Sequence, residues 1–194
     1  EFKNIANDFT DGDRIFIISS IFGGTGASGF PLLLKTLRTN DSLPNHGLIN
    51  KAEIGAVTVL PYFKVTQDEN SSIESDTFIS KTKAALDYYE KNIGRDINAL
   101  YYIGDNSTAQ KSYDNNEGGD MQVNNAHLIE MLSALAIVDF ANTQSNIGGP
   151  VYKEFGLISD DVENVIFSDF APGTLGVIRK PMTQMMLFTH YLKK

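Results

Sequence analysis

The sequence contains no cysteine and no tryptophan, and its basic residues are outnumbered by acidic ones. Without cysteine, the chain has no disulfide bonds, no cysteine nucleophile and no thiolate metal site. The 16 Lys and Arg residues against 24 Asp and Glu residues give a formal net charge of -8. Surfaces that bind DNA or RNA need many positive charges to neutralise phosphates. We therefore expect no nucleic-acid partner.

Long apolar segments are also missing from the sequence. No apolar run reaches the roughly 18 residues that a membrane-spanning helix requires. The start EFKNIANDF does not have the pattern of a signal peptide. With 194 residues, of which 42% are hydrophobic, the chain can bury one sizeable core or two small ones. We expect a soluble cytoplasmic protein that has no contact with a membrane.

Strand-like and helix-like patterns alternate along the chain. Continuous β-branched or apolar runs predict strands, and apolar residues three to four positions apart predict helices. The predicted strands cover residues 14–22, 54–63, 97–103 and 162–167, and the predicted helices cover 30–38, 77–92, 121–142 and 181–192. Polar and glycine-containing segments predict loops at 67–76, 111–120 and 143–150 and a turn at 173–176. The alternation indicates an α/β fold with parallel strands.

A glycine-rich segment, GGTGASG at residues 23–29, joins the first predicted strand to the first predicted helix. Glycine lets backbone N–H groups approach a ligand, and the N-terminus of a helix favours an anion. The segment lacks the GK[ST] ending of a P-loop, so it is not a Walker A site. We expect a phosphate cradle formed by Gly23, Gly24, Thr25, Gly26, Ala27 and Ser28. Substitution of Gly26 by valine is then expected to block the phosphate and to leave the fold intact.

Four segments resemble, in the same order and at similar spacing, the nucleotide-binding domain of the tubulin/FtsZ superfamily. They are DRIFIISSIFGGTGASGFP, IGAVTVLPYFKV, INALYYIGDN and VNNAHLIEMLSALAIV, in a part of the chain that runs from residue 13 to the end of the long predicted helix. The resemblance implies a three-layer α/β fold with a mostly parallel sheet and flanking helices. Residues 1–148 would form the nucleotide-binding domain, and residues 149–194 would form a C-terminal extension or a second small domain. The ligand would be GTP or GDP, with magnesium.

The resemblance also implies roles for individual residues. Gly23, Gly24, Thr25 and Gly26 would hold the phosphates, Asp105 or Asn106 would lie beside the ribose or the base, and Asn124 or Asn125 would face the guanine. Capping of the long helix is an equal alternative for the two asparagines. Val65 stands where the family has an acidic residue near the ribose. The earlier strands of the family have no counterpart before residue 13, so either the chain is a fragment or the resemblance is partial.

No catalytic residue can be assigned from the sequence. In the resembling family, an acidic loop that follows the core helix completes hydrolysis in the next subunit of a filament. The corresponding segment here, ANTQSNIGGP, contains no acidic residue. We therefore expect a nucleotide-binding switch or assembly module that associates with itself or with a protein partner, with weak GTPase activity or none.

Two other functions compete with this one. Gly23, Gly26 and Gly29 also fit a G-x-x-G-x-x-G motif, which favours an NAD(P)-binding protein that resembles short-chain dehydrogenases. The second predicted strand, however, ends in Pro61 and aromatic residues instead of a ribose-binding acid, and no Tyr stands four residues before a Lys. The third alternative is an interaction module without a ligand, whose apolar last helix and acidic surface would contact a partner. The glycines would then form only a tight turn between strand and helix. The histidines are too far apart for a helical metal pair, so we expect no metal site; they are His46, His127 and His190.

Overall fold

The computed structural model describes residues 2–66, 75–104, 111–115, 127–143, 149–158 and 165–193. Its central sheet has four strands in the order β1-β2-β4-β6: β1 (Arg14–Ser20), β2 (Glu53–Val59), β4 (Ala99–Ile103) and β6 (Val151–Phe155). All three neighbouring pairs are parallel. The predicted α/β fold with a mostly parallel sheet is thus confirmed.

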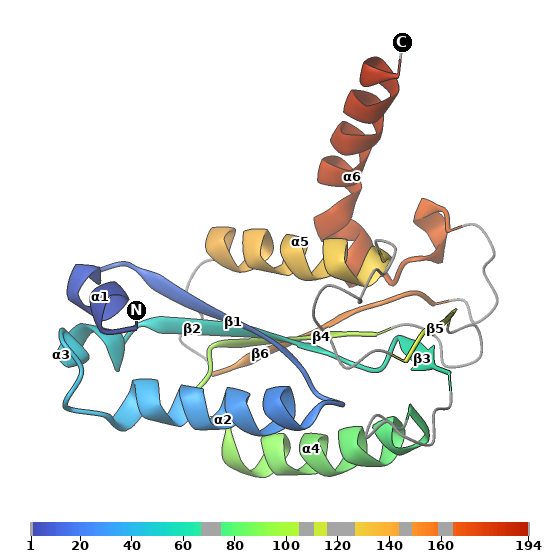
Figure 1. Ribbon diagram of the computed structural model, residues 1–194. Coiled ribbons are helices and arrows are strands. Elements are labelled where there is room, and N and C mark those ends of the chain that lie inside the picture. The colour runs from blue at the N-terminus through green and yellow to red at the C-terminus, as the bar shows by residue number, and fades with distance from the viewer. Residues whose placement is uncertain are drawn as a thin grey trace.

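Helices flank both faces of the sheet (Figure 1). On one face lie α2 (Gly24–Thr39) and α4 (Phe78–Asn92), and on the opposite face lies α5 (Leu128–Asn142). The C-terminal helix α6 (Pro172–Leu192) begins beside α5 and β6 and then projects away from the sheet. Two short helices, α1 (Phe2–Asp8) and α3 (His46–Ile49), lie near the starts of β1 and β2. The sheet therefore lies between two helical layers.

Successive side chains of each strand enter different hydrophobic cores. In β4, Leu100 belongs to the core under α2 and α4, whereas its neighbour Tyr101 belongs to the core under α5. Both side chains are fully buried. Because side chains alternate between the faces of a strand, a strand covered by helices on both sides must be apolar at consecutive positions. This requirement explains the continuous apolar runs in the sequence.

A smaller parallel sheet follows the carboxyl ends of two central strands. It pairs β3 (Phe63–Val65) with β5 (Lys111–Tyr113), and the 3-10 helix η1 (Ser75–Thr77) leads into α4. The loop prediction for residues 111–120 is wrong for residues 111–113. A polar strand of three residues is too short to show a recognisable pattern in the sequence. Only its pairing with β3 identifies it as a strand.

The C-terminal part of the chain corrects two further predictions. Within the described part of the segment 162–167, no strand is present: residues 165 and 166 are irregular, and Phe167 begins the 3-10 helix η3 (Phe167–Asp169). The fourth central strand is β6 instead. Its residues alternate between exposed and partly buried positions, but the sequence pattern did not predict a strand there. The turn predicted at 173–176 lies inside α6, because Pro172 starts this helix and the buried Thr174 and Ile178 anchor it. The division of the chain at residue 148 stays a prediction.

Candidate functional site

The glycine-rich segment lies where β1 ends and α2 begins. β1 ends at Ser20, and α2 already begins at Gly24, so most of the segment expected as a loop forms the first turns of the helix. In open α/β sheets, ligands bind beyond the carboxyl ends of the strands. A pocket of about 800 Å³ opens at this place between α2 and α4. Four of the six predicted cradle residues line it: Gly23, Gly24, Ala27 and Ser28.

The first turn of α2 has free backbone donors. The N–H of Ala27 donates to the carbonyl of Gly23 at 2.9 Å, which is the first hydrogen bond of the helix. The N–H groups of Gly24, Thr25 and Gly26 precede this bond and therefore have no acceptor within the helix. Gly23 occupies the N-cap position and has no side chain that accepts from them. An uncapped helix N-terminus favours a bound anion.

The side chains of the segment contribute less than the sequence predicted. The Ser28 hydroxyl donates to the carbonyl of Gly24 at 2.7 Å, so its hydrogen is already used within the helix. Thr25 and Gly26 are not among the residues that line the pocket. The phosphate-binding roles of Thr25 and Ser28 stay predictions, and the backbone N–H groups of the first turn are the donors that have no acceptor within the helix.

Gly26 has a packing role that the sequence prediction missed. A Cβ atom at this position would lie 2.1 Å from the carbonyl oxygen of Ser20, far inside van der Waals contact. The expectation that Gly26 can be replaced by valine without disturbing the fold is therefore wrong, because α2 crosses directly over the end of β1. Gly24 differs, since a Cβ atom there would meet no atom within 4 Å.

The electrostatic character of the pocket is opposite to that of the chain. Lys35 on α2 and Lys81 on α4 both line it, and none of the lining residues that the structure describes is acidic. The remainder of the wall is apolar and includes Pro31, Leu32 and the half-exposed Tyr88. In a chain with a net charge of -8, such a pocket favours a ligand with an anionic end and a flat or apolar end.

Tyr89 holds the two helices of the pocket together. Its hydroxyl donates to the carbonyl of Ala27 at 2.9 Å, and its ring meets Phe30 edge to face at 5.2 Å. Burial raises the pKa of Tyr89 to about 12. The Tyr89 hydroxyl is thus protonated at neutral pH and joins α4 to α2 as a structural contact.

Two hydroxyl groups near this end of the sheet also escaped the sequence analysis. Ser19 of β1 and Thr58 of β2 are neighbours in the strand register. Neither side-chain oxygen has a hydrogen-bond partner in the described part of the molecule, and Thr58 is fully buried. Both lie in strands covered by α2 and α4, and a polar ligand or a water molecule that reaches them would satisfy these hydroxyls.

An aromatic cluster covers the neighbouring carboxyl ends of the strands. Phe22, which follows β1, contacts Phe78 at 5.0 Å and Phe63 at 5.6 Å between ring centroids. Tyr62 contacts Phe63 at 5.0 Å and the His127 ring at 4.8 Å. Burial, together with nearby Glu130, raises the pKa of Tyr62. The Pro-aromatic end of the second predicted strand was the sequence signal for this cluster.

A polar network on the other face of the sheet connects α5 to two strands. The Asp139 carboxylate accepts a hydrogen bond from the Tyr101 hydroxyl at 2.7 Å and forms an ion pair with Lys153. Burial and the hydrogen bond to Asp139 raise the pKa of Tyr101, which keeps its hydroxyl protonated. The Tyr101 hydroxyl and the Lys153 ammonium group are both bonded to the Asp139 carboxylate, so these three groups hold α5 in position against β4 and β6.

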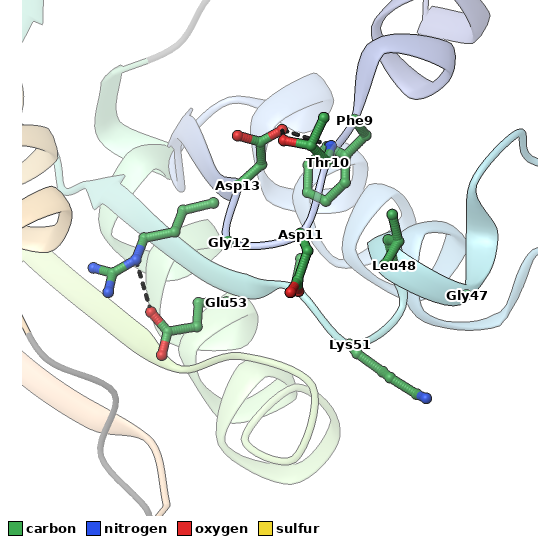
Figure 2. A pocket seen from close by; sticks show the side chains of 11 residues that line it. Phe9, Thr10, Asp11, Gly12, Asp13, Gly47, Leu48, Lys51 and Glu53 are labelled. Carbon is green, nitrogen blue, oxygen red and sulfur yellow. Dashed lines mark hydrogen bonds and ion pairs between the residues drawn. The ribbon is translucent and has the colours of Figure 1, made fainter.

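A second pocket lies at the opposite end of the strands and is smaller, at about 280 Å³ (Figure 2). Two of the three carboxylates that line it, those of Asp13 and Glu53, are already engaged. Asp13 accepts hydrogen bonds from the N–H and hydroxyl of Thr10 at 2.7 and 2.9 Å, which lowers the pKa of Asp13. Glu53 pairs with Arg14 at 2.9 Å. Within the described ranges, no group of three or more His, Asp or Glu residues is placed to hold a metal ion.

The predicted ribose and base residues cannot be compared with the structure. Asp105, Asn106, Asn124 and Asn125 lie outside the described residues. The predicted helix over 121–142 is observed from Leu128, and His127 caps it by accepting the N–H of Ile129 at 3.1 Å. None of the helices in the part of the chain that is described has the length and apolar character to cross a membrane.

Comparison of the chain with family models, with curated proteins and with solved structures gives no significant match. The resemblance to the tubulin/FtsZ superfamily and the alternative dinucleotide motif therefore both stay predictions.

Proposed function

We propose that the chain binds a nucleotide, with the phosphates at the N-terminus of α2. One observation carries this proposal: the pocket beyond β1 combines an uncapped helix N-terminus with Lys35 and Lys81 and with no described acidic residue. Lys81 lies one turn into α4, whose first residue Phe78 contacts Phe22 just before the free N–H groups, whereas Lys35 lies about 16 Å further along α2. Free N–H groups together with the ammonium group of Lys81 favour a multiply charged anion over a neutral ligand.

The apolar wall of the same pocket suits the other end of a nucleotide. Leu32 and Tyr88 lie on α2 and α4, and Tyr88 is half exposed, so its ring is accessible for stacking. The volume of about 800 Å³ lies in the range of small-molecule and cofactor sites. The resemblance of the four sequence segments to the tubulin/FtsZ superfamily favours GTP or GDP as the ligand.

The proposed function is binding with weak hydrolysis or none. No described residue that lines the pocket is an Asp, a Glu or a His, which are the usual general bases. A magnesium ion would need oxygen ligands, and here the phosphates and water would have to supply them.

Isothermal titration with GTP, GDP, ATP, NADPH and pyrophosphate tests the proposal. We expect binding of GTP and GDP and weaker binding of pyrophosphate. Gly24→Val should weaken all of these, because its side chain would enter the pocket in front of the free N–H groups. Gly29→Val is the matched control, since a Cβ atom at Gly29 also meets no atom within 4 Å but Gly29 does not line the pocket. Equal affinities of the two variants would contradict the location of the site.

The lysines allow a second pair of variants on one helix. Lys81→Ala removes a cation from the pocket and should weaken phosphate binding roughly tenfold, as is typical when a charged hydrogen bond is lost. Lys83→Ala removes an exposed cation of α4 that does not line the pocket and should have little effect. If the unchanged chain binds none of the five ligands at millimolar concentration, the proposal is wrong.

NAD(P) binding is the second candidate, and one observation favours it. The close approach of Gly26 to the carbonyl of Ser20 is the kind of helix-strand contact that glycines of dinucleotide motifs permit. The segment after β2, however, reads Leu60-Pro61-Tyr62 and offers no acid for the ribose. Binding of NADPH in preference to GTP in the same titration would support this candidate.

A further inference from the structure

Three buried hydroxyl groups lie in the core between the sheet and the helices α2 and α4. They belong to Ser19 of β1, Thr58 of β2 and Thr82 of α4, and within the described part of the molecule none of the three has a hydrogen-bond partner. Thr58 is fully buried, and Thr82 is 7% exposed. A buried hydroxyl without a partner costs free energy, so native structures ordinarily supply one.

The strand register places two of these hydroxyls side by side. Ser19 and Thr58 are direct neighbours in the parallel ladder of β1 and β2. Side chains two positions apart in a strand point to the same face of the sheet. Ser19 therefore shares a face with Ile17, and Thr58 shares one with Ala56, and both of these neighbours belong to the core under α2 and α4.

The third hydroxyl enters the same core from α4. Its buried residues Phe78, Thr82 and Tyr89 lie four and seven positions apart, which places them on one face of the helix. Phe78 contacts Phe22, just beyond β1, at 5.0 Å between ring centroids, and α4 runs back over the sheet from there (Figure 1). Thr82 lies about 6 Å further along α4. It therefore faces the last residues of β1 and β2.

The Thr82 hydroxyl also differs from the other helical hydroxyls. Six of them donate to the carbonyl four residues earlier, namely those of Ser28, Thr36, Thr39, Ser133, Thr183 and Thr189. Ser133 does so at 2.8 Å although it is as buried as Thr82. Thr82 makes no such bond to Phe78, so its hydroxyl is free to bond across the core.

We propose that a water molecule is bound between β1, β2 and α4 by the hydroxyls of Ser19, Thr58 and Thr82. The three groups are neutral, and each can donate or accept, which suits water and not an ion. A buried water molecule ordinarily makes about three hydrogen bonds to polar groups that have no other partner. The short side chains of Ala56, beside Thr58, and of Ala85, one turn after Thr82, leave room for it. This site does not depend on nucleotide binding.

The variants Thr58→Val and Thr82→Val test the site through the sign of their effect. Valine has the shape of threonine but no hydroxyl. If the hydroxyls had no partner, valine would raise the midpoint of urea denaturation, because an unsatisfied polar group is removed. With water bound, each variant should lower the midpoint by about 0.5 M, because the water loses a hydrogen bond. A raised or unchanged midpoint in either variant would overturn the proposal.

A double-mutant cycle tests whether the two hydroxyls share one water molecule. Thr58→Val combined with Thr82→Val should lower the midpoint by less than the sum of the single changes, because both disturb the same water. Thr174 provides the matched control, since it is fully buried in α6 and its hydroxyl already accepts the N–H of Gly156 at 3.1 Å. Thr58→Val combined with Thr174→Val should be additive. Additivity of the first pair would contradict a shared water.

A crystal structure provides the direct measurement. We expect a water molecule within about 3.2 Å of the hydroxyl oxygens of both Thr58 and Thr82. It should also be present in Thr82→Ser, which keeps the hydroxyl, and it should be lost or displaced in Thr82→Val. Hydroxyls that bond directly to each other or to another part of the chain, with no water between them, would overturn the proposal.

Discussion

Replacement of Gly26 by alanine should destabilise the fold, although alanine is the better helix former. The added Cβ atom would lie 2.1 Å from the carbonyl oxygen of Ser20, whereas real Cβ atoms essentially never come closer than 3.0 Å. The start of α2 must therefore move by about 1 Å. The obstacle is backbone and cannot rotate away, because the next residue, Ile21, is bonded to β2 through the carbonyl of Val59.

The expected cost follows from two opposing effects. Overpacking of this kind costs up to about 3 kcal/mol, and the change from glycine to alanine in a helix returns up to about 1 kcal/mol. We expect a net loss of about 2 kcal/mol in the free energy of unfolding. Gly24→Ala is the matched control on the same turn, because its Cβ atom meets nothing within 4 Å. It should be neutral or stabilising by about 0.5 kcal/mol.

Urea denaturation followed by circular dichroism measures both variants. With a slope of about 2 kcal/mol/M, the midpoint of Gly26→Ala should fall by about 1 M and that of Gly24→Ala should rise slightly. A Gly26→Ala midpoint at or above that of Gly24→Ala would show that α2 does not cross β1 at this distance. The packing role of Gly26 would then be refuted.

Three further predictions concern other contacts of the fold. Gly55→Ala should destabilise the chain by about 1 to 3 kcal/mol in urea denaturation, because its Cβ atom would lie 2.8 Å from the Phe140 ring; an unchanged midpoint would contradict the contact. Since burial raises the pKa of Tyr89 to about 12, the stabilising effect of its neutral hydroxyl is complete below about pH 10 and is lost between pH 10 and 12, at up to about 1.4 kcal/mol per pH unit. Tyr89→Phe should therefore be less stable at neutral pH and should lose less stability than the unchanged chain between pH 10 and 12; parallel pH profiles would refute this assignment. Asp139→Asn removes the negative charge from a half-buried ion pair and should lower the free energy of unfolding by about 1 to 3 kcal/mol at neutral pH, which thermal denaturation would detect.

The local sequence pattern was sufficient to predict the helices and strands that contain long apolar runs. The strand around Ile17, the strand around Val57 and the helix around Tyr89 were all predicted close to their observed places. These segments carry their own signal, because a strand or helix that is covered on one or both faces must repeat apolar residues at a fixed period. The glycine-rich junction was also located correctly between β1 and α2.

The predictions failed where a residue is defined by its neighbours in space. β6 and β5 are strands because β4 and β3 offer them free backbone groups, and neither segment has an apolar run or a regular alternation of apolar and polar residues in its sequence. The glycines of residues 173–176 suggested a turn, but burial of Ile178 against the sheet keeps them in a helix. Intrinsic preference is weak compared with such tertiary contacts.

The sequence by itself determined the α/β class, the parallel pairing of its main strands and the position of a helix N-terminus rich in glycine. Only the tertiary structure decided what each glycine does: Gly24 opens to a pocket, and Gly26 is pressed against Ser20. It also decided that Lys35 and Lys81, which are far apart in the sequence, both line that pocket. The physical reason is that period and propensity act between residues close in sequence, whereas crossing distances, pockets and sheet edges depend on residues far apart in it.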